Sequence, residues 1–324
     1  MTIAAQKPLS SRREFIFLYD IKMGTPDSDT GKNRPRVLPD GTHYVTDLRL
    51  KRFVRDFFKL RNREILVDKI GGEITNLTGR IAHYLSQKGL KKAEGRELVN
   101  ILLDAFIDLR LFGSSFAFNR DGDWEPKTEP KTLSGPVQIN MGEVMHQAEE
   151  IVIHGTSMVG SDQEKSKREL NTFIGLRYAM IGFSGIVNEH SAATSRLSDA
   201  DYDLFLEAMW HGVRVAANTR TKRGQMPHLL IDVKYKPGNE FQYGRLHEYL
   251  RLEPIGDKPE KAWSSPQDYR INMRKLVERL IAQDNRIEEV RFSKSPDITL
   301  ALEFPEGGWK GGWKNMDFDG RDPS

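Results

Sequence analysis

Lysine and arginine are concentrated in one stretch of this 324-residue chain. Residues 31–63 hold ten Lys or Arg against three Asp or Glu, a local charge of +7 in a chain whose net charge is only +3. Basic charge concentrated in this way attracts a polyanion, whereas charge that serves only solubility can be spread evenly. Guanidinium groups can also grip phosphate oxygens bidentately. The residue types and their spacing therefore predict phosphate binding.

Several of the basic candidates share one predicted helix. Residues 47–60 place apolar side chains at helical spacing, and Thr46 stands where a helix N-cap is expected. The opposite face is basic, as it can be on an ordinary solvated helix. The basic loop beside it favours the interpretation that this face binds a polyanion. The candidates are Arg34 and Arg36 in the loop and Arg49, Lys51, Arg52 and Arg55 on the helix.

A second basic region lies far along the chain. Residues 208–231 contain no Asp or Glu, and Arg220, Lys222 and Arg223 lie there in a loop that leaves a helix. Arg110 ends another predicted helix. Each of these residues alone could compensate a helix dipole. Together with the first cluster they predict a groove that follows a nucleic-acid backbone.

The apolar patterns supply the elements that must position these groups. Residues 14–21 form a near-continuous apolar run, which is typical of a strand buried on both faces. Residues 98–109 fit one amphipathic helix, and Ser198 caps another with a core face over 204–213. The other expected strands are 114–118, 135–139, 150–154, 178–187 and 228–235.

The order of these elements predicts an α+β fold. Two successive strand–helix–strand units are typical of the ferredoxin-like or RRM-like arrangement. The surplus length is assigned to insertions at 68–94, which is punctuated by glycine, and 155–171, which is polar. The aromatic strand with which RRM domains stack bases is missing, so binding on the sheet face is not expected.

Composition excludes several classes of protein. The chain has no cysteine, which excludes disulfides, thiolate catalysis and Cys-ligated zinc and is compatible with the cytoplasm. No apolar run approaches the roughly 18 residues of a membrane span, and the N-terminus lacks the hydrophobic region of a signal peptide. We therefore expect a soluble cytoplasmic protein without a membrane partner.

Catalytic and metal-binding motifs are incomplete. Residues 24–32 hint at a P-loop, but the glycines are too far apart and Asn33 replaces the magnesium-binding hydroxyl residue. Asp27 and Asp29 lack the further ligands of a calcium loop, and the eight His show no zinc-binding pair. We expect no enzyme, no metal and no cofactor, and we interpret both acids as solvated loop residues.

Longer segments resemble a known family. The segment FLYDIKMGTPDSDTGKNRPRVLPDGTHYVTDLRLKRFVRDFF at 17–58 is similar to the opening of the CRISPR-associated family-seven proteins, the repeated backbone subunit of type I Cascade complexes. DLRLFGSSF at 108–116, SGPVQINMGEVMH at 134–146 and YAMIGFSGIVNEHSA at 178–192 resemble the same family in the same order. These blocks lie within 17–233, and subtype I-B is the nearest match.

The resemblance implies a domain organisation. It implies an RRM-like palm over 1–250, with a fingers insertion at about 64–97 and a thumb at about 155–172. Residues 251–306 are expected to extend the palm. The Gly/Trp-rich tail, 307–324, lies outside the resemblance and is expected to be flexible or packed on the scaffold.

The resemblance also implies partners. They are a CRISPR RNA, target DNA paired with that guide, copies of the chain in a helical filament, and other Cascade subunits. Gln138, within 134–146, joins the RNA-binding candidates, and Met158 and Val159 are the expected thumb residues that wedge into the strand. Such a subunit binds RNA without cutting it.

Two alternatives remain open. One is a metal-dependent RNA endonuclease of the type III backbone kind, which would use Asp27 or Asp29. The other is a general single-stranded RNA-binding protein outside CRISPR, which would show the same basic clusters.

Overall fold

A long central strand organises the molecule. The computed structural model describes the chain except for residues 1–6, 30, 74, 120–123, 125, 129, 157–169, 217–220, 303–312 and 321–324. β1 (Arg13–Gly24) contains the predicted strand 14–21, which is therefore confirmed. It pairs antiparallel with β10 (Leu170–Val187) on one side and β11 (Met226–Tyr235) on the other.

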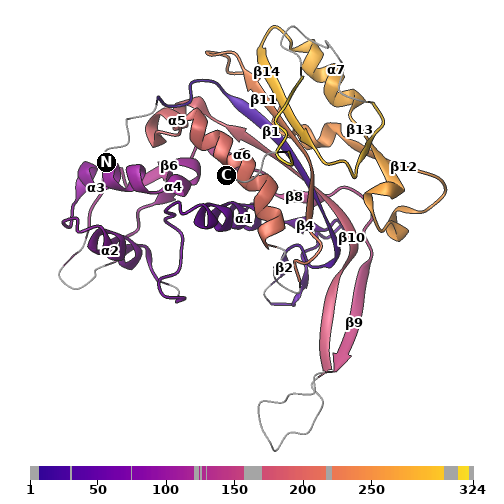
Figure 1. Ribbon diagram of the computed structural model, residues 1–324, viewed down its shortest axis with the longest axis horizontal. Helices are drawn as coiled ribbons and strands as arrows, with labels where there is room; N and C mark the ends of the chain where they lie inside the picture. The colour runs from indigo at the N-terminus through magenta and orange to yellow at the C-terminus, as the bar shows by residue number, and fades with distance from the viewer. Residues whose placement is uncertain are drawn as a thin grey trace, which may run out of the picture.

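These strands form the centre of a nine-stranded sheet. Its order is β16-β14-β11-β1-β10-β8-β4, and β7 and β9 also pair with β10 (Figure 1). Most neighbours are antiparallel, but β16 lies parallel to β14 at one edge. The further strands are β4 (Tyr44–Val45), β7 (Val137–Ile139), β8 (Gly142–Val144), β9 (Glu150–Thr156), β14 (Ile287–Lys294) and β16 (Trp313–Asn315).

Two helices cover one face of the sheet. α1 (Asp47–Leu60) begins at Thr46, whose side chain accepts a hydrogen bond from Arg49 N, and α6 (Asp199–Val215) begins with a capping box at Ser198. Both caps and both apolar faces are as predicted. The helices cross closely, because a Cβ at Gly212 would lie 2.6 Å from the Phe53 carbonyl oxygen. Only glycine fits there.

The C-terminal third covers the other face. Ile16 and Leu18 of β1 are fully buried in a cluster with Trp263, Ile271 and Leu276. This layer contains α7 (Arg274–Ala282), the strands β12 (Arg251–Pro254), β13 (Tyr269–Asn272) and β15 (Thr299–Leu300), and the 3-10 helices η2 (Leu246–Tyr249), η3 (Glu260–Ala262) and η4 (Pro266–Asp268). Both faces of the central sheet are therefore occupied by protein.

A helical lobe is inserted after α1. It has its own hydrophobic cluster, built from Leu66 through Leu133, so the predicted insertion at 64–97 shares a core with later residues. The single helix expected at 98–109 is wrong, because Phe106 adopts an extended conformation and breaks it. The lobe and its surroundings contain α2 (Leu77–Gln87), α3 (Gly95–Ala105), α4 (Ile107–Phe112), β5 (Gly113–Ser115), β6 (Thr132–Ser134) and α5 (Glu189–Ser195).

A two-stranded arm projects from the sheet (Figure 1). It consists of β9 (Glu150–Thr156) and the first part of β10, paired from Leu170↔Thr156 to Leu176↔Glu150. The arm leads into the predicted thumb, of which residues 157–169, with Met158 and Val159, lie outside the described residues.

The described part of the tail packs on the scaffold. Met316 and Phe318 are each 6% exposed and join the core cluster beneath α6. Asp319 accepts hydrogen bonds from Trp210 Nε1 at 2.9 Å and Arg214 Nη1 at 2.6 Å. For residues 313–320 the packed interpretation is therefore the right one.

Candidate nucleic-acid interface

Three segments converge where β1 ends and the arm begins. Gly24, the last residue of β1, lies opposite Leu176 of β10. Thr25 then donates its N–H to Thr221 O at 2.8 Å and its hydroxyl to Ile174 O at 2.8 Å. The loop after β1, the turn before β11 and the arm are thereby fixed to one another.

A buried carboxylate, Asp27, connects the start of α1 and two arginines to this junction. Thr46 donates its backbone N–H and its hydroxyl to Asp27 Oδ2 at 3.1 and 2.7 Å. Arg36 Nε lies 3.3 Å from Oδ2, and Arg49 Nε lies 3.5 Å from Oδ1. Asp27 is only 4% exposed, so its interpretation as a solvated loop acid is wrong. Two guanidinium groups and the N-cap compensate the desolvation of this carboxylate.

Arg34 is held in place by a residue of the arm. β3 (Arg34–Pro35) pairs with β2 (Ser28–Asp29), and Arg34 Nη2 lies 2.5 Å from Glu150 Oε2, at the first residue of β9. Glu150 Oε1 lies 3.0 Å from His43 Nε2. Partial burial acts to raise the pKa of Glu150, but the hydrogen bonds with His43 and Arg34 hold this pKa below its ordinary value.

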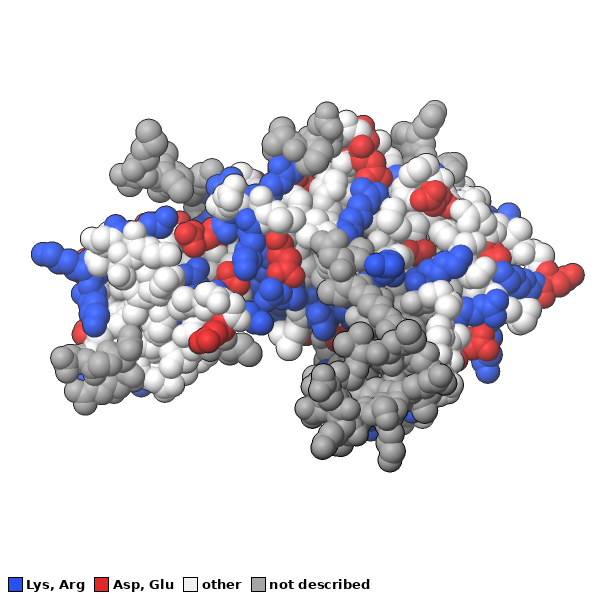
Figure 2. All heavy atoms as spheres, turned by 60° about the horizontal axis from the view of Figure 1, so that its bottom comes forward, with Lys and Arg blue, Asp and Glu red and all other residues white. Residues whose placement is uncertain are grey.

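These contacts bring five basic residues to one region, which we call the arm-base surface: Lys22, Arg34, Arg36, Arg49 and Arg223. Lys22 and Arg223 are exposed, and the side chains of the other three are between 28 and 46% exposed. Figure 2 shows Lys and Arg gathered on this side of the molecule, with Asp and Glu interspersed. Four of the five are among the candidates predicted from the sequence. Lys22 is not, because it directly follows the apolar run 14–21 within the same strand, β1.

Lys222 lies beneath this surface rather than on it. It is 7% exposed, and its Nζ donates a hydrogen bond to Thr25 O. Burial, reinforced by the nearby charge of Arg49, lowers the pKa of Lys222 to about 8. This predicted phosphate contact is thus a buried group that holds the loop after β1.

The pH dependence of stability tests this placement. Between pH 8 and 10.5 the folded chain has released the Lys222 proton while the unfolded chain still binds it, so this lysine makes stability rise with pH. The difference in unfolding free energy between wild type and Lys222→Met should change by about 3 kcal/mol across that window. Urea unfolding at several pH values measures it. A constant difference would contradict the burial of the ammonium group.

Two other candidates on α1 form i,i+4 pairs within the helix. Lys51 Nζ lies 2.9 Å from Asp47 Oδ2, and Arg52 Nη2 lies 2.8 Å from Asp56 Oδ1. Such i,i+4 pairs contribute only about 0.3–0.5 kcal/mol. Arg52, whose side chain is 42% exposed, can therefore exchange its partner for a phosphate at little cost.

Arg55 and Arg110 are held inside the protein. Arg55 Nε lies 2.8 Å from Oδ2 of Asp108, which is 1% exposed, and Arg110 makes two 2.8 Å hydrogen bonds to Asp201. The two arginine side chains are 12 and 17% exposed. The basic face expected for α1 is thus partly an internal face that meets the helical lobe.

Gln138 is not brought to the arm-base surface. Gln138 is exposed on β7 opposite Ile186 of β10, and its amide donates to Gly135 O at 2.7 Å. That position is ten residues along β10 from Leu176, or about 33 Å at 3.3 Å per residue. Arg220 lies outside the described residues.

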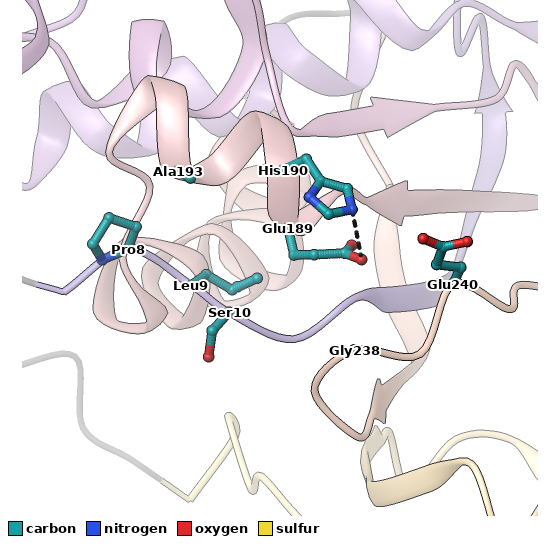
Figure 3. Close-up of a pocket in the computed structure, with 8 residues that line it drawn as sticks. All are labelled: Pro8, Leu9, Ser10, Glu189, His190, Ala193, Gly238 and Glu240. Atoms are coloured by element: carbon teal, nitrogen blue, oxygen red, sulfur yellow. Dashed lines mark ion pairs between the residues drawn. The ribbon is translucent and has the colours of Figure 1, made fainter.

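A pocket of about 320 Å³ lies at the opposite end of β1 (Figure 3). It contains Glu189, which pairs with Arg12 at 3.0 Å, and the exposed His190, 3.6 Å from Glu189. Its lining is Pro8, Leu9, Ser10, Glu189, His190, Ala193, Gly238 and Glu240. The two carboxylates disfavour a phosphate ligand, so the pocket is not part of the candidate interface.

Among the described residues, no group of three or more His, Cys, Asp or Glu is arranged to hold a metal ion. None of the helices in the described ranges combines the length and hydrophobicity of a bilayer-spanning segment.

Comparison with known proteins assigns the family. Residues 11–274 match the family described as CRISPR-associated protein Cas7. The chain belongs to this family. A curated relative, "CRISPR-associated protein Cas7" of Haloferax volcanii, is 29% identical over 296 residues, which cover 86% of this chain and 85% of the relative. Residues 275–324, which include the tail, lie beyond the family match.

Comparison with solved structures gave further matches. A chain of a "CRISPR RNA-guided surveillance complex, pre-nicking" aligns with a TM-score of 0.51 and 11% identity over 95% of this chain and 97% of that chain. A chain of a second "CRISPR RNA-guided surveillance complex" aligns with a TM-score of 0.47, 12% identity and 94% coverage of both chains. The first match shows that this mixed α/β fold occurs in such complexes.

Proposed function

We propose that this Cas7-family chain is a non-catalytic backbone subunit of a type I CRISPR effector complex that binds CRISPR RNA along the arm-base surface. The observation that carries the proposal is the convergence on Asp27. One buried carboxylate fixes Arg36 and Arg49, and the adjoining contacts bring Lys22, Arg34 and Arg223 beside them. Arginines fixed in this way are suited to phosphate oxygens.

The covered sheet favours recognition of the RNA backbone rather than its bases. In an RRM domain an open sheet face stacks bases, whereas here Ile16 and Leu18 on that face are fully buried beneath the C-terminal layer. Contacts with phosphates impose no sequence on the guide. The bases would then remain free to pair with target DNA.

The topology supports an RRM-like palm. Helix α1 follows β1, helix α6 follows β10, and the central strands lie in the order β11-β1-β10, with β7, β8 and β9 beyond β10. This is the strand order of a ferredoxin-like fold. The helical lobe would be the fingers, the arm the base of the thumb, and β14 with the C-terminal layer the extension of the palm.

The proposed partners follow from the family. They are CRISPR RNA, target DNA through the guide, further copies of the chain and other Cascade subunits in the cytoplasm. A heterologous contact that does not close would repeat these copies along the RNA as a helical filament. The family match disfavours a general RNA-binding protein outside CRISPR.

The environment of Asp27 disfavours the endonuclease alternative. Its Oδ2 already accepts from Thr46 and faces Arg36, and its Oδ1 faces Arg49, so a divalent cation there would be repelled by two guanidinium groups. We expect purified protein with Mg²⁺ or Mn²⁺ to leave guide and complementary RNA intact. The Asp27→Asn variant should leave both RNAs intact as well. Gel analysis of labelled RNA tests this. Cleavage that is lost in Asp27→Asn or Asp29→Ala would establish the nuclease.

RNA recovered with the protein from its own cells tests the binding proposal. Mass spectrometry and sequencing of the recovered nucleic acid should find CRISPR repeat and spacer RNA. Cellular RNA without repeats would instead support the general RNA-binding protein.

A further inference from the structure

Met23 lies in an unusual conformation within the arm-base surface. Its φ is +52°, in the left-handed region that residues other than glycine seldom adopt. The residue is 46% exposed to solvent. An exposed large apolar residue on a strained backbone is unfavourable on both counts. Strained residues of this kind cluster at ligand-binding sites.

The surroundings explain the bend but not the side chain. A Cβ on the next residue, Gly24, would lie 2.9 Å from Thr221 O, so β1 must turn just before it to let Thr25 bond to Thr221. Glycine at position 23 would satisfy this turn without strain. The geometry therefore requires the turn, but it does not require a methionine.

The neighbours of Met23 are basic. Lys22 precedes it and is exposed, and the turn 221–224, which carries the exposed Arg223, lies against the backbone of residues 22–25. A phosphate held by these cations would place its sugar and base within reach of the intervening apolar side chain. Methionine is flexible and polarizable and packs favourably against aromatic rings.

We infer that Met23 is an RNA-contacting residue that packs against a sugar or base of the guide strand between phosphates held by the arm-base surface. This inference rests on the proposed function and deepens it. The Met23 contact is apolar, so it carries no counterion release, whereas each phosphate contact does.

The Met23→Gly variant removes the proposed RNA contact without disturbing the fold. The variant keeps the turn and relieves its strain, so its melting temperature should stay close to that of wild type. Its affinity for short single-stranded RNAs of unrelated sequence should fall about three- to tenfold, because an apolar contact is lost. The slope of log affinity against log salt should stay unchanged. Fluorescence anisotropy at several salt concentrations measures both quantities.

Two further variants make the result specific. Met23→Leu should recover most of the affinity, because it restores apolar area. Ile281→Ala removes an equally exposed apolar side chain, at 45%, from α7 in the C-terminal layer and should leave affinity unchanged. If Met23→Gly binds RNA with wild-type affinity, the inference is overturned. The same holds if the variant binds RNA normally and only its self-association is weaker. Failure of the wild type itself to bind RNA would instead overturn the proposed function.

Discussion

Replacing Arg34, Arg49 and Arg223 together by alanine should weaken RNA binding by roughly two to three orders of magnitude, since each charge-assisted contact contributes roughly 1–1.5 kcal/mol. The loss should be alike for unrelated RNA sequences. The slope of log affinity against log salt should fall by about 2, or 0.7 for each phosphate contact on a single strand. Anisotropy titrations at three or more salt concentrations give both values.

The triple variant is designed to keep its fold. Arg34 and Arg49 are 46 and 32% exposed, and Asp27 retains Arg36 and the cap residue Thr46 when Arg49 is removed. The matched control is the replacement of three arginines of the C-terminal layer, Arg245, Arg251 and Arg270, by alanine. It changes the net charge equally and should keep wild-type affinity and slope. Equal losses in both variants would mean that only net charge matters.

Removal of Arg55 should destabilise the fold. Oxygens of Asp108 accept from Leu66 N at 2.6 Å, Val67 N at 3.2 Å and Arg55 Nε at 2.8 Å, so this buried carboxylate joins the helical lobe to α1. Arg55→Ala leaves the charge without its cation, which costs about 3 kcal/mol. The melting temperature should fall by about 6 °C. Calorimetry or thermal circular dichroism measures this fall.

Arg52→Ala is the control on the same helix. Arg52 pairs with Asp56 within the helix at a partly exposed position, so its loss should move the melting temperature by no more than about 1 °C. Equal destabilisation of the two variants would show that the contact between Arg55 and Asp108 adds nothing to the stability of the lobe.

The parts of the fold that depend on near neighbours in sequence could be predicted. The caps Thr46 and Ser198 and the apolar faces of α1 and α6 follow from residues three or four positions apart, where sequence periodicity carries the information. The prediction of a single helix at 98–109 was wrong for a related reason. Phe106 is buried although its backbone is extended, so the apolar pattern continues through the break.

The site depends on contacts that sequence order conceals. Arg55 meets Asp108 and Lys222 meets Thr25 across 53 and 197 positions, and no local pattern signals either pair. Whether a basic residue faces solvent or a buried carboxylate therefore required the structure. The basic composition singled out segments that the structure brings together, but it could not separate Arg49, on the surface, from Lys222 beneath it.

Cross-linking of bound RNA tests directly whether the RNA lies on the arm-base surface. Protein purified with its RNA from its own cells is irradiated, and the cross-linked peptides are identified by mass spectrometry. We expect nucleotide adducts on peptides from segments 22–36, 46–52 and 221–226, which form and flank the arm-base surface. Adducts confined to the C-terminal layer at 245–300, with none in these three segments, would contradict it.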